Sequence, residues 1–253
     1  MYLNLINEND MVTLKQLLSY SDDNNIPQIT ARRDVKELLD QEIILYEMGL
    51  LKISNKSDAE ITRDKKRTLN LNEKREIAEY VSQRFEALTD GIDSIFLGSG
   101  TTIEEVVKYI HKPVKNLYTY GIEVAREAGF NDNIENIYLL GGNYRRRSHA
   151  VSGQSTIDQL ENLTFTLSLF TATHILDDGF IYNNNQSEAK LISEVMKASR
   201  SNYFLMDSSK FSLNIGGVKV APVNLTNGII TDSTIDLEKR DVLDKIKNLI
   251  IAK

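Results

Sequence analysis

A short run of glycines and hydroxyl side chains offers the clearest binding chemistry in this sequence. Residues 96–105 read FLGSGTTIEE, so an apolar strand pattern enters a Gly-Ser-Gly turn and a helix pattern leaves it. Such a loop points backbone N–H groups inward, and a helix N-terminus favours an anion. It lacks the lysine of a Walker A motif and the third glycine of the dinucleotide fingerprint. The loop therefore predicts a site for one phosphate monoester; the alternative is a tight turn without a ligand.

Two other polar segments also follow apolar strand patterns. Residues 139–153 read LLGGNYRRRSHAVSG, and each arginine offers a planar fork that suits phosphate or carboxylate. Residues 206–211 read MDSSKF, which brings an acid, two hydroxyls and an ammonium to a strand end. If Asp207, Lys210 and Glu188 converge on a sugar phosphate, they could transfer protons next to a carbonyl. The alternatives are a solvated basic loop and a simple ion pair between Asp207 and Lys210.

A fourth charged cluster lies near the N-terminus, where residues 30–34 read TARRD. Arg32 and Arg33 can contact phosphates or guanine edges, and Thr30 can donate to a phosphate. Gln28 and Lys36 fall on the same predicted helix, so we include them as DNA-contact candidates. The alternative is a solvated charged helix face, which is the commoner role of such a triplet.

Short helices and a hairpin are predicted around this cluster. Residues 13–18 predict a helix capped by Thr13, and a second helix begins near Pro27. Residues 43–46 and 50–53 predict a β-hairpin. Two helices followed by a hairpin are typical of a winged helix-turn-helix. The polar stretch 54–67 lacks sustained apolar periodicity, so we predict a DNA-binding domain at residues 1–54, a linker at 55–71 and an effector-sensing domain at 72–253.

The larger domain alternates between helix and strand patterns. We expect helices at residues 72–88, 103–109, 187–198 and 238–249, and strands at residues 94–97, 117–119, 137–140, 167–171, 202–206 and 228–231. Such alternation predicts the α/β class with a mostly parallel, doubly wound sheet. Sheets of this kind bind ligands at the carboxyl ends of their strands, which is where the polar segments lie.

Composition narrows the function classes. The 253 residues are 41% apolar, which is enough for a packed core, and they contain no cysteine and three histidines. Disulfides and thiolate metal sites are therefore excluded, and a histidine-built metal site or a Ser-His-Asp triad has little material. No apolar run approaches the roughly 20 residues that span a bilayer. We expect a cytoplasmic protein with no metal, no cofactor, no membrane partner and no catalytic residues.

The net charge of −6 is unusual for a protein that binds nucleic acid. Residues 1–55 carry five basic and nine acidic side chains, whereas residues 56–67 carry five basic and three acidic ones. DNA affinity depends strongly on phosphate neutralisation, so the second group is a candidate contact to the DNA backbone.

Taken together, these segments resemble the DeoR family of bacterial regulators over nearly the whole chain. Residues 30–35 with Leu38 are similar to the T-I-R-R-D-L recognition helix of that family, and residues 98–102 to its phosphate loop. Gly141-Gly142, Tyr144-Arg145 and Gly153 resemble a further signature. Glu188-Ala189 and residues 207–210 resemble the last two. Each motif is weak alone, but all of them occur in the order of the family.

The resemblance implies an effector domain related to ribose-5-phosphate isomerase, a phosphorylated sugar as effector, and dimers or tetramers. Five residues would hold the phosphate: Gly98, Ser99, Gly100, Thr101 and Thr102. The residues near the sugar would be Gly142, Arg145, Glu188, Asp207 and Lys210. Thr119 and Tyr120 stand where the family has a sugar-side Thr-Asn pair.

The resulting prediction is a sequence-specific DNA-binding regulator, a repressor of a sugar-utilisation operon, whose operator affinity a sugar phosphate controls. One alternative is an isomerase-type enzyme that acts on sugar phosphates. Another is a sugar-phosphate sensor whose acidic N-terminal domain no longer binds DNA.

Overall fold

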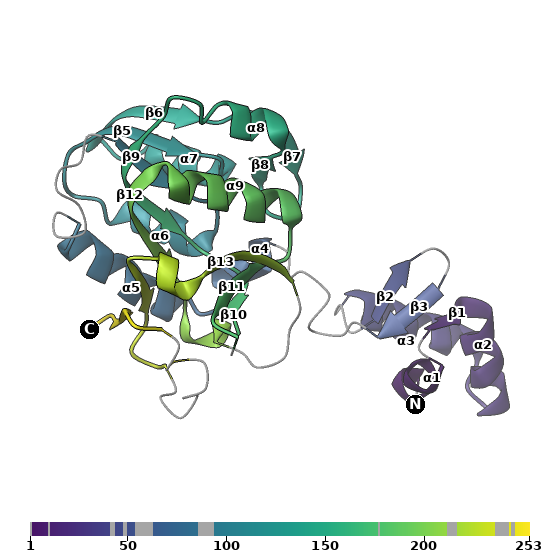
Figure 1. Cartoon of the computed structure of the whole chain (residues 1–253). Helices are drawn as coiled ribbons and strands as arrows, with labels where there is room; N and C mark the ends of the chain where they lie inside the picture. Colours follow the sequence, from purple (N-terminus) through teal and green to yellow (C-terminus); the bar gives the residue numbers. More distant parts are fainter. Residues whose placement is uncertain are drawn as a thin grey trace. The chain divides into compact units, whose positions relative to one another are not determined.

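The protein is described by a computed structural model that covers residues 2–9, 11–40, 44–47, 50–53, 63–85, 94–176, 178–211, 217–235, 243 and 246–253. The chain divides into two compact units, Met1–Glu60 and Ile61–Lys253. Figure 1 shows the elements of each unit.

The first unit has the predicted order of two helices and a hairpin. Its elements are α1 (Tyr2–Glu8), β1 (Met11–Thr13), α2 (Leu14–Asp23), α3 (Gln28–Asp40), β2 (Ile44–Glu47) and β3 (Leu50–Ile53). Thr13 caps α2 as predicted, because its hydroxyl accepts from the N–H of Gln16. The three-residue strand β1 pairs with β3 and was not predicted, since so short a segment has no readable alternation.

The core of the first unit is formed by one face of each helix and by the hairpin. Leu17, Ala31, Ile44 and Leu51 are all fully or almost fully withdrawn from water. Val35 lies one turn after Ala31 and is also buried, so α3 packs through this face. The opposite face of α3 is left to the solvent.

The second unit is built on a parallel seven-stranded sheet, which confirms the predicted α/β class. Within the described residues its strand order is β15-β14-β12-β9-β4-β5-β6, and all the pairings are parallel. The strands are β4 (Ser94–Leu97), β5 (Val114–Thr119), β6 (Ile134–Leu139), β9 (Phe165–Phe170), β12 (Ser199–Leu205), β14 (Gly228–Thr231) and β15 (Leu249–Ile251). The helices are α4 (Arg63–Thr68), α5 (Leu71–Gln83), α6 (Thr101–Lys108), α7 (Ile122–Ala128), α8 (Gln154–Asp158) and α9 (Gln186–Lys197).

The strand order reverses at β4. From β4 the chain adds β5 and β6 on one side, and it then returns to place β9, β12, β14 and β15 on the other. The helices that next follow β4 and β9, α6 and α9, therefore pack on opposite faces of the sheet. In sheets of this kind the ligand binds at that switch point, outside the carboxyl ends of the strands. The Gly-Ser-Gly loop leaves β4 at this place.

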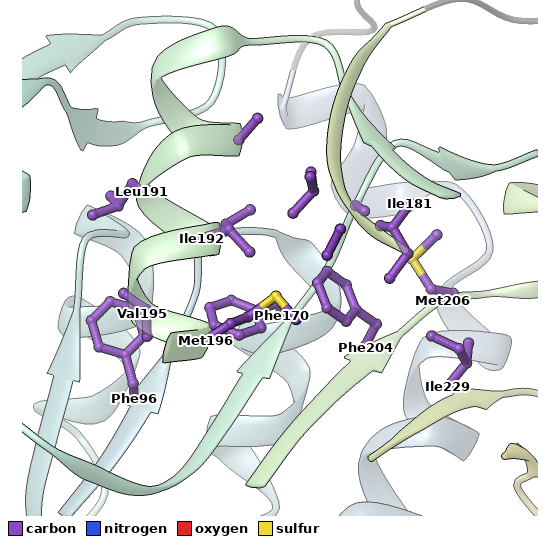
Figure 2. Packing of buried hydrophobic residues seen from close by; sticks show 14 of the residues in the cluster. Phe96, Phe170, Ile181, Leu191, Ile192, Val195, Met196, Phe204, Met206 and Ile229 are labelled. Atoms are coloured by element: carbon purple, nitrogen blue, oxygen red, sulfur yellow. The ribbon is translucent and has the colours of Figure 1, made fainter. Parts of the chain in front are cut away.

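Alternation along the strands divides the core between the two faces of the sheet. Ile95 and Leu97 belong to the cluster that includes residues of α5, α6 and α7, whereas Phe96 points to the opposite face. There Phe96 and Phe170 pack among residues of α9 such as Ile192 (Figure 2). Both faces of the sheet are thus covered, which explains why its strands read as apolar runs.

Two smaller sheets complete the second unit. The hairpin of β7 (Asn143–Arg145) and β8 (Ala150–Ser152) follows β6. An antiparallel sheet of order β10-β11-β13 is formed by His174–Ile175, Phe180–Asn183 and Val218–Pro222. Two 3-10 turns, η1 (Ser208–Lys210) and η2 (Val223–Leu225), follow β12 and β13.

The structure differs from the predicted boundaries at two places. Helix α4 and the first residue of α5 lie inside the predicted linker 55–71, and both belong to the second unit. The polar sequence of α4 concealed this helix, because it shows no apolar face and Arg63 and Arg67 attach it through ion pairs. Most of the predicted helix 238–249 lies outside the described residues, but Leu249 begins a strand, β15.

Candidate functional site

The loop between β4 and α6 is held close to the end of β9. The N–H of Gly98 donates to the carbonyl of Leu169 at 2.8 Å, and the hydroxyl of Thr171 donates to the carbonyl of Ser99 at 3.0 Å. Gly100 has φ +124° and ψ 155°, which is essentially a glycine-only conformation. A Cβ on Gly100 would lie 2.5 Å from the Thr171 hydroxyl oxygen. The Gly-Ser-Gly sequence is therefore required by a tight backbone approach at the start of α6.

The end of β5 packs against the same loop. The buried hydroxyl of Thr119 donates to the carbonyl of Gly98 at 3.4 Å and accepts from the N–H of Gly121 at 3.0 Å. Tyr120 is also buried, and burial together with the nearby charge of Glu188 raises the pKa of its phenol, which is hydrogen-bonded to Ser99. These two residues therefore join the phosphate-loop candidates to the first turn of α9.

Glu188 connects the arginine-rich segment 145–148 to Tyr120 and the loop between β4 and α6. Asn185 caps α9 by accepting from the N–H of Glu188 at 2.9 Å, which fixes the carboxylate at the first turn of the helix. The Glu188 carboxylate then accepts from the hydroxyl of Ser148 at 2.7 Å and pairs with Arg145 at 3.5 Å. Because Glu188 is almost fully buried, its charge depends on these partners. Arg145 stays half-buried and can still reach an anion.

Lys210 and Asp207 come to the other side of the loop from the end of β12. The Lys210 ammonium donates to the carbonyl of Ala172 at 2.8 Å, next to Thr171. Asp207 is buried and accepts from the side-chain amide of Asn70 at 3.0 Å. Burial lowers the pKa of Lys210 to about 8, although Asp207 opposes that shift. Lys210 can therefore change its charge near neutral pH.

Two other lysines contribute positive charge at Lys210. Lys66 and Lys74 both act to lower the pKa of Lys210, as like charges nearby do. Lys74 is itself buried, which lowers its pKa, and it donates to the backbone carbonyls of Lys66 and Leu69. Lys66 of α4, Lys74 of α5 and Lys210 of η1 therefore bring positive charge together near the end of β9, which favours an anion.

The remaining effector candidates have other surroundings. Thr102 is buried in the first turn of α6. Thr101 is buried too, and its hydroxyl donates to the carbonyl of Lys66 at 3.4 Å. Gly142 has φ +155° and lies close to Thr156 and to the carbonyl of Ser152, so it packs against the segment from β8 to α8. A role for Gly142 in ligand binding stays a prediction.

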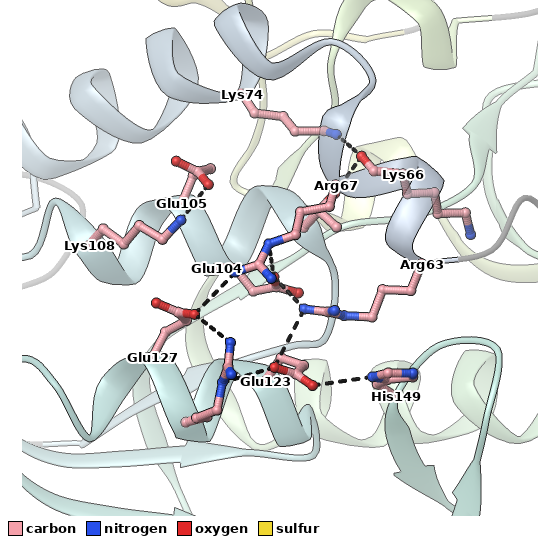
Figure 3. A network of polar contacts seen from close by, with 12 residues as sticks. Arg63, Lys66, Arg67, Lys74, Glu104, Glu105, Lys108, Glu123, Glu127 and His149 are labelled. Atoms are coloured by element: carbon pink, nitrogen blue, oxygen red, sulfur yellow. Dashed lines mark hydrogen bonds and ion pairs between the residues drawn. The ribbon is translucent and has the colours of Figure 1, made fainter.

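Helix α4 is joined to α6 and α7 by a network of ion pairs, which Figure 3 shows. Arg63 is 6% exposed and pairs with Glu104, which is 1% exposed and lies in the first turn of α6. Arg67 contacts Glu127 of α7 at 3.3 Å and Glu104 at 4.0 Å. The helix that opens the second unit is therefore tied to the helix that starts at the phosphate loop.

Glu123 extends this network to the loop between β7 and β8. Its carboxylate lies 3.0 Å from Arg126, 3.2 Å from the Nδ1 of His149 and 4.0 Å from Arg63. Burial opposes its ionisation, but the hydrogen bond to His149 and the charges of Arg63 and Arg126 hold the pKa of Glu123 below its ordinary value. The charge of Glu123 is thus retained at neutral pH.

The DNA-contact candidates lie on α3 of the first unit. Arg32, Arg33 and Lys36 are exposed, and Arg33 forms only a long contact of 3.8 Å with Asp34. Gln28 is exposed, but its side-chain amide donates to Asp22 at 2.6 Å, so this group is engaged in the turn between α2 and α3. Thr30 is half-buried. The three basic side chains are available to an anionic partner.

The described residues contain no group of three or more His, Asp or Glu side chains that could hold a metal ion. No helix among them is long and apolar enough to cross a membrane.

Sequence reasoning missed several residues at this site, namely Arg63, Lys66, Asn70, Lys74 and Thr171. Lys74 alone left a local signal, because it falls three residues before Ile77 on the apolar face of the predicted helix. A lysine at such a position must find partners when it is buried. The others make contacts between segments far apart in the chain, which no local pattern reveals.

The chain is similar to known regulators both in its larger unit and over its length. A family model described as the DeoR C terminal sensor domain matches residues 69–233. This match spans more than half of the chain. The chain belongs to the DeoR family. The matched residues include the phosphate loop, Arg145, Glu188, Asp207 and Lys210, which agrees with the resemblance that the sequence motifs indicated.

Several curated proteins align with this chain over most of its length. The lactose phosphotransferase system repressor of Staphylococcus epidermidis is 27% identical, over 97% of this chain and 95% of that protein. The HTH-type transcriptional regulator GlpR of Haloferax volcanii is 29% identical, over 89% of this chain and 86% of its own. The glycerol-3-phosphate regulon repressor of Escherichia coli is 25% identical, over 95% and 92%.

Among solved structures, ribose 5 phosphate isomerase A from Neisseria gonorrhoeae aligns with a TM-score of 0.38 and 15% identity. The alignment covers 56% of this chain and about half, 54%, of the isomerase chain.

Replacing Gly100 with alanine tests the geometry of the loop. Gly100→Ala should lower the free energy of unfolding by about 1–3 kcal/mol and weaken phosphate binding, because alanine is strained at this φ and its Cβ meets Thr171. Gly129→Ala is the control, since Gly129 has φ −64° at the end of α7, and its effect should stay within about 0.5 kcal/mol. Urea unfolding and phosphate titration measure both. Equal stability and affinity for the two variants would contradict the geometry.

Proposed function

We propose that this chain is a sequence-specific DNA-binding transcription regulator, a repressor of a sugar-utilisation operon, whose operator affinity responds to a phosphorylated sugar. The observation that carries the proposal is the convergence of the phosphate loop, Arg145, Glu188 and Lys210 at the switch point of the sheet, in a chain that also carries a separate helical unit with exposed basic residues on α3. Three relatives that match over most of its length, two named as repressors and one as an HTH-type transcriptional regulator, support the same function. Such a regulator would act in the cytoplasm, beside the DNA that it reads.

The phosphate group of the effector would bind at the loop that starts α6. The dipole of an eight-residue helix favours an anion there, and three lysines supply positive charge nearby. Glu188 pairs with Arg145 and lies near the buried Tyr120, so we assign these two side chains to the hydroxyls of the sugar. A sugar with one terminal phosphate would place its phosphate at the loop and its hydroxyls at Glu188 and Arg145.

Ligand binding would reach the DNA-binding unit through α4. Thr101, a predicted phosphate contact, donates to the carbonyl of Lys66, and Asn70 donates to Asp207, a predicted sugar contact. A ligand that takes over Thr101 or Asp207 competes with these bonds. Because α4 is the first described element of the second unit, we propose that a change in α4 is passed on to the DNA-binding unit. By linkage, DNA binding must then change ligand affinity by the same factor.

We propose that the chain assembles as a dimer or tetramer, because two recognition helices would then read two operator half-sites. In that arrangement a shift in α4 changes the spacing of two heads at once, which a palindromic operator detects.

The test of this function is fluorescence anisotropy of labelled DNA from upstream of the chain's own gene, at low salt, with and without a panel of sugar phosphates. We expect saturable binding that one sugar phosphate shifts and that its unphosphorylated parent leaves unchanged. Arg32→Ala combined with Arg33→Ala should weaken binding by several kcal/mol, at about 1–3 kcal/mol for each contact. Lys115→Ala, an exposed lysine of the second unit, is the control. Unchanged affinity in the double variant would exclude α3 as the recognition helix.

The pH dependence of effector binding tests the role of Lys210. A phosphate dianion favours the charged form of Lys210, so binding raises the pKa of this lysine above its free value of about 8. Affinity should therefore change little between about pH 7 and 8, where a phosphate that titrates near pH 6 is already a dianion, and then fall by up to about tenfold per pH unit above that range. Lys210→Met should weaken binding at pH 7 and flatten the profile, whereas the exposed Lys197→Met should not. Titration calorimetry from pH 7 to 9.5 measures the affinity, and an affinity of the wild type that does not change over this range would contradict the role of Lys210.

A second candidate function rests on the same lysine. A lysine with a pKa of about 8 beside Asp207 is suited to proton transfer, which is the chemistry of a sugar-phosphate isomerase. Turnover of a pentose or hexose phosphate that Lys210→Met abolishes, without saturable DNA binding, would favour the enzyme. Absence of DNA binding together with stoichiometric co-purification of another protein would favour a sensor whose first unit no longer reads DNA.

A further inference from the structure

One apolar side chain stands on the solvent face of α3. Ile29, the second residue of the helix, is 81% exposed, more than any other large apolar side chain among the described residues. The apolar residues that follow it, Ala31 and Val35, are buried against the core of the first unit. Ile29 therefore does not belong to the face through which α3 packs.

Folding of the first unit does not account for an isoleucine at this position. A β-branched side chain loses χ1 freedom in a helix and lowers helix propensity, and Ile29 gains no burial in return. Arg33 and Lys36 follow at i+4 and i+7, the spacings that place side chains on one helix face, and both are exposed. An isolated apolar group thus stands at the N-terminal end of a basic stripe.

The basic stripe decides which partner fits this surface. An apolar protein surface that covered Ile29 would also have to cover the nearby ammonium and guanidinium groups, and unpaired buried charges are costly. DNA offers phosphates to Arg33 and Lys36 and an apolar group to Ile29 in the same groove. Among the base edges of the major groove, that apolar group is the C5 methyl of thymine.

We propose that Ile29 reads a thymine in each operator half-site by packing against its C5 methyl group. In helix-turn-helix proteins the N-terminal residues of the recognition helix contact the base edges, and Ile29 occupies that end of α3. Arg33 and Lys36 hold the helix in the groove through phosphates or neighbouring bases. The inference rests on the proposed DNA-binding function and adds one base to what the operator must contain.

Deoxyuridine differs from thymidine only by this methyl group, so it provides the test. The operator within the upstream DNA is delimited by footprinting, and each thymine is replaced singly by deoxyuridine. The full-length wild-type chain should lose about fourfold in affinity at one position of each half-site, the value for one methyl-sized group removed from contact. Ile29→Ala should bind the thymine and deoxyuridine operators equally. Leu225→Ala, an exposed apolar residue of the second unit, should keep the wild-type discrimination.

The outcomes separate this inference from the function on which it rests. Wild-type chain that binds the operator but discriminates at no thymine overturns the contact to Ile29 and leaves the regulator intact. Discrimination that persists in Ile29→Ala likewise overturns it. Failure of the wild-type chain to bind any upstream DNA overturns both proposals. Circular dichroism of Ile29→Ala, whose exposed side chain contributes no core packing, verifies that the helix is retained.

Discussion

Arg63 and Glu104 are both almost fully withdrawn from water, so each charge depends on the other to remain in the interior. Glu104 lies in the first turn of α6, immediately after the phosphate loop, and Arg63 is the first residue of α4. The pair therefore fixes the segment that enters the second unit against the helix that begins at the predicted ligand site. Removing one partner of such a pair typically costs about 3–5 kcal/mol. Because of its position, we propose this pair as the link between effector binding and DNA binding.

The sheet and its glycine loop could be predicted from the sequence because their signals are local. Phe96 and its neighbours form an apolar run between turn residues, and a run of this kind requires a strand covered on both faces. Gly98 and Gly100 follow at the end of that run, where Gly100 adopts a conformation closed to other residues. Thr13 similarly predicts the start of α2, because a threonine is a favoured N-cap residue. In each case neighbouring residues contain all the information required.

The contacts that turn these elements into a site could not be predicted. The carboxylate of Asp207 accepts from Asn70, 137 positions earlier in the chain, and Lys210 reaches the carbonyl of Ala172. Helix α4 reads as a linker because its core contact is a buried charge pair and no apolar face marks it. The small β10-β11-β13 sheet escaped prediction partly for a related reason, since β13 pairs with β11 from about 40 positions further along the chain, and partly because β10 has only two residues. Only the folded chain brings these groups together.

The change in operator affinity caused by the effector, compared between wild type and Glu104→Gln, tests the central claim most directly. Gln keeps the shape of Glu104 and removes the charge that holds Arg63, so this variant should still bind both operator and sugar phosphate. The factor by which the effector changes operator affinity, typically 5–150-fold in allosteric proteins, should fall toward one. Arg63→Lys, which keeps the charge, should retain part of the shift, and Glu194→Gln, at a surface pair with Lys197, should retain all of it. A full wild-type shift in Glu104→Gln would contradict the account.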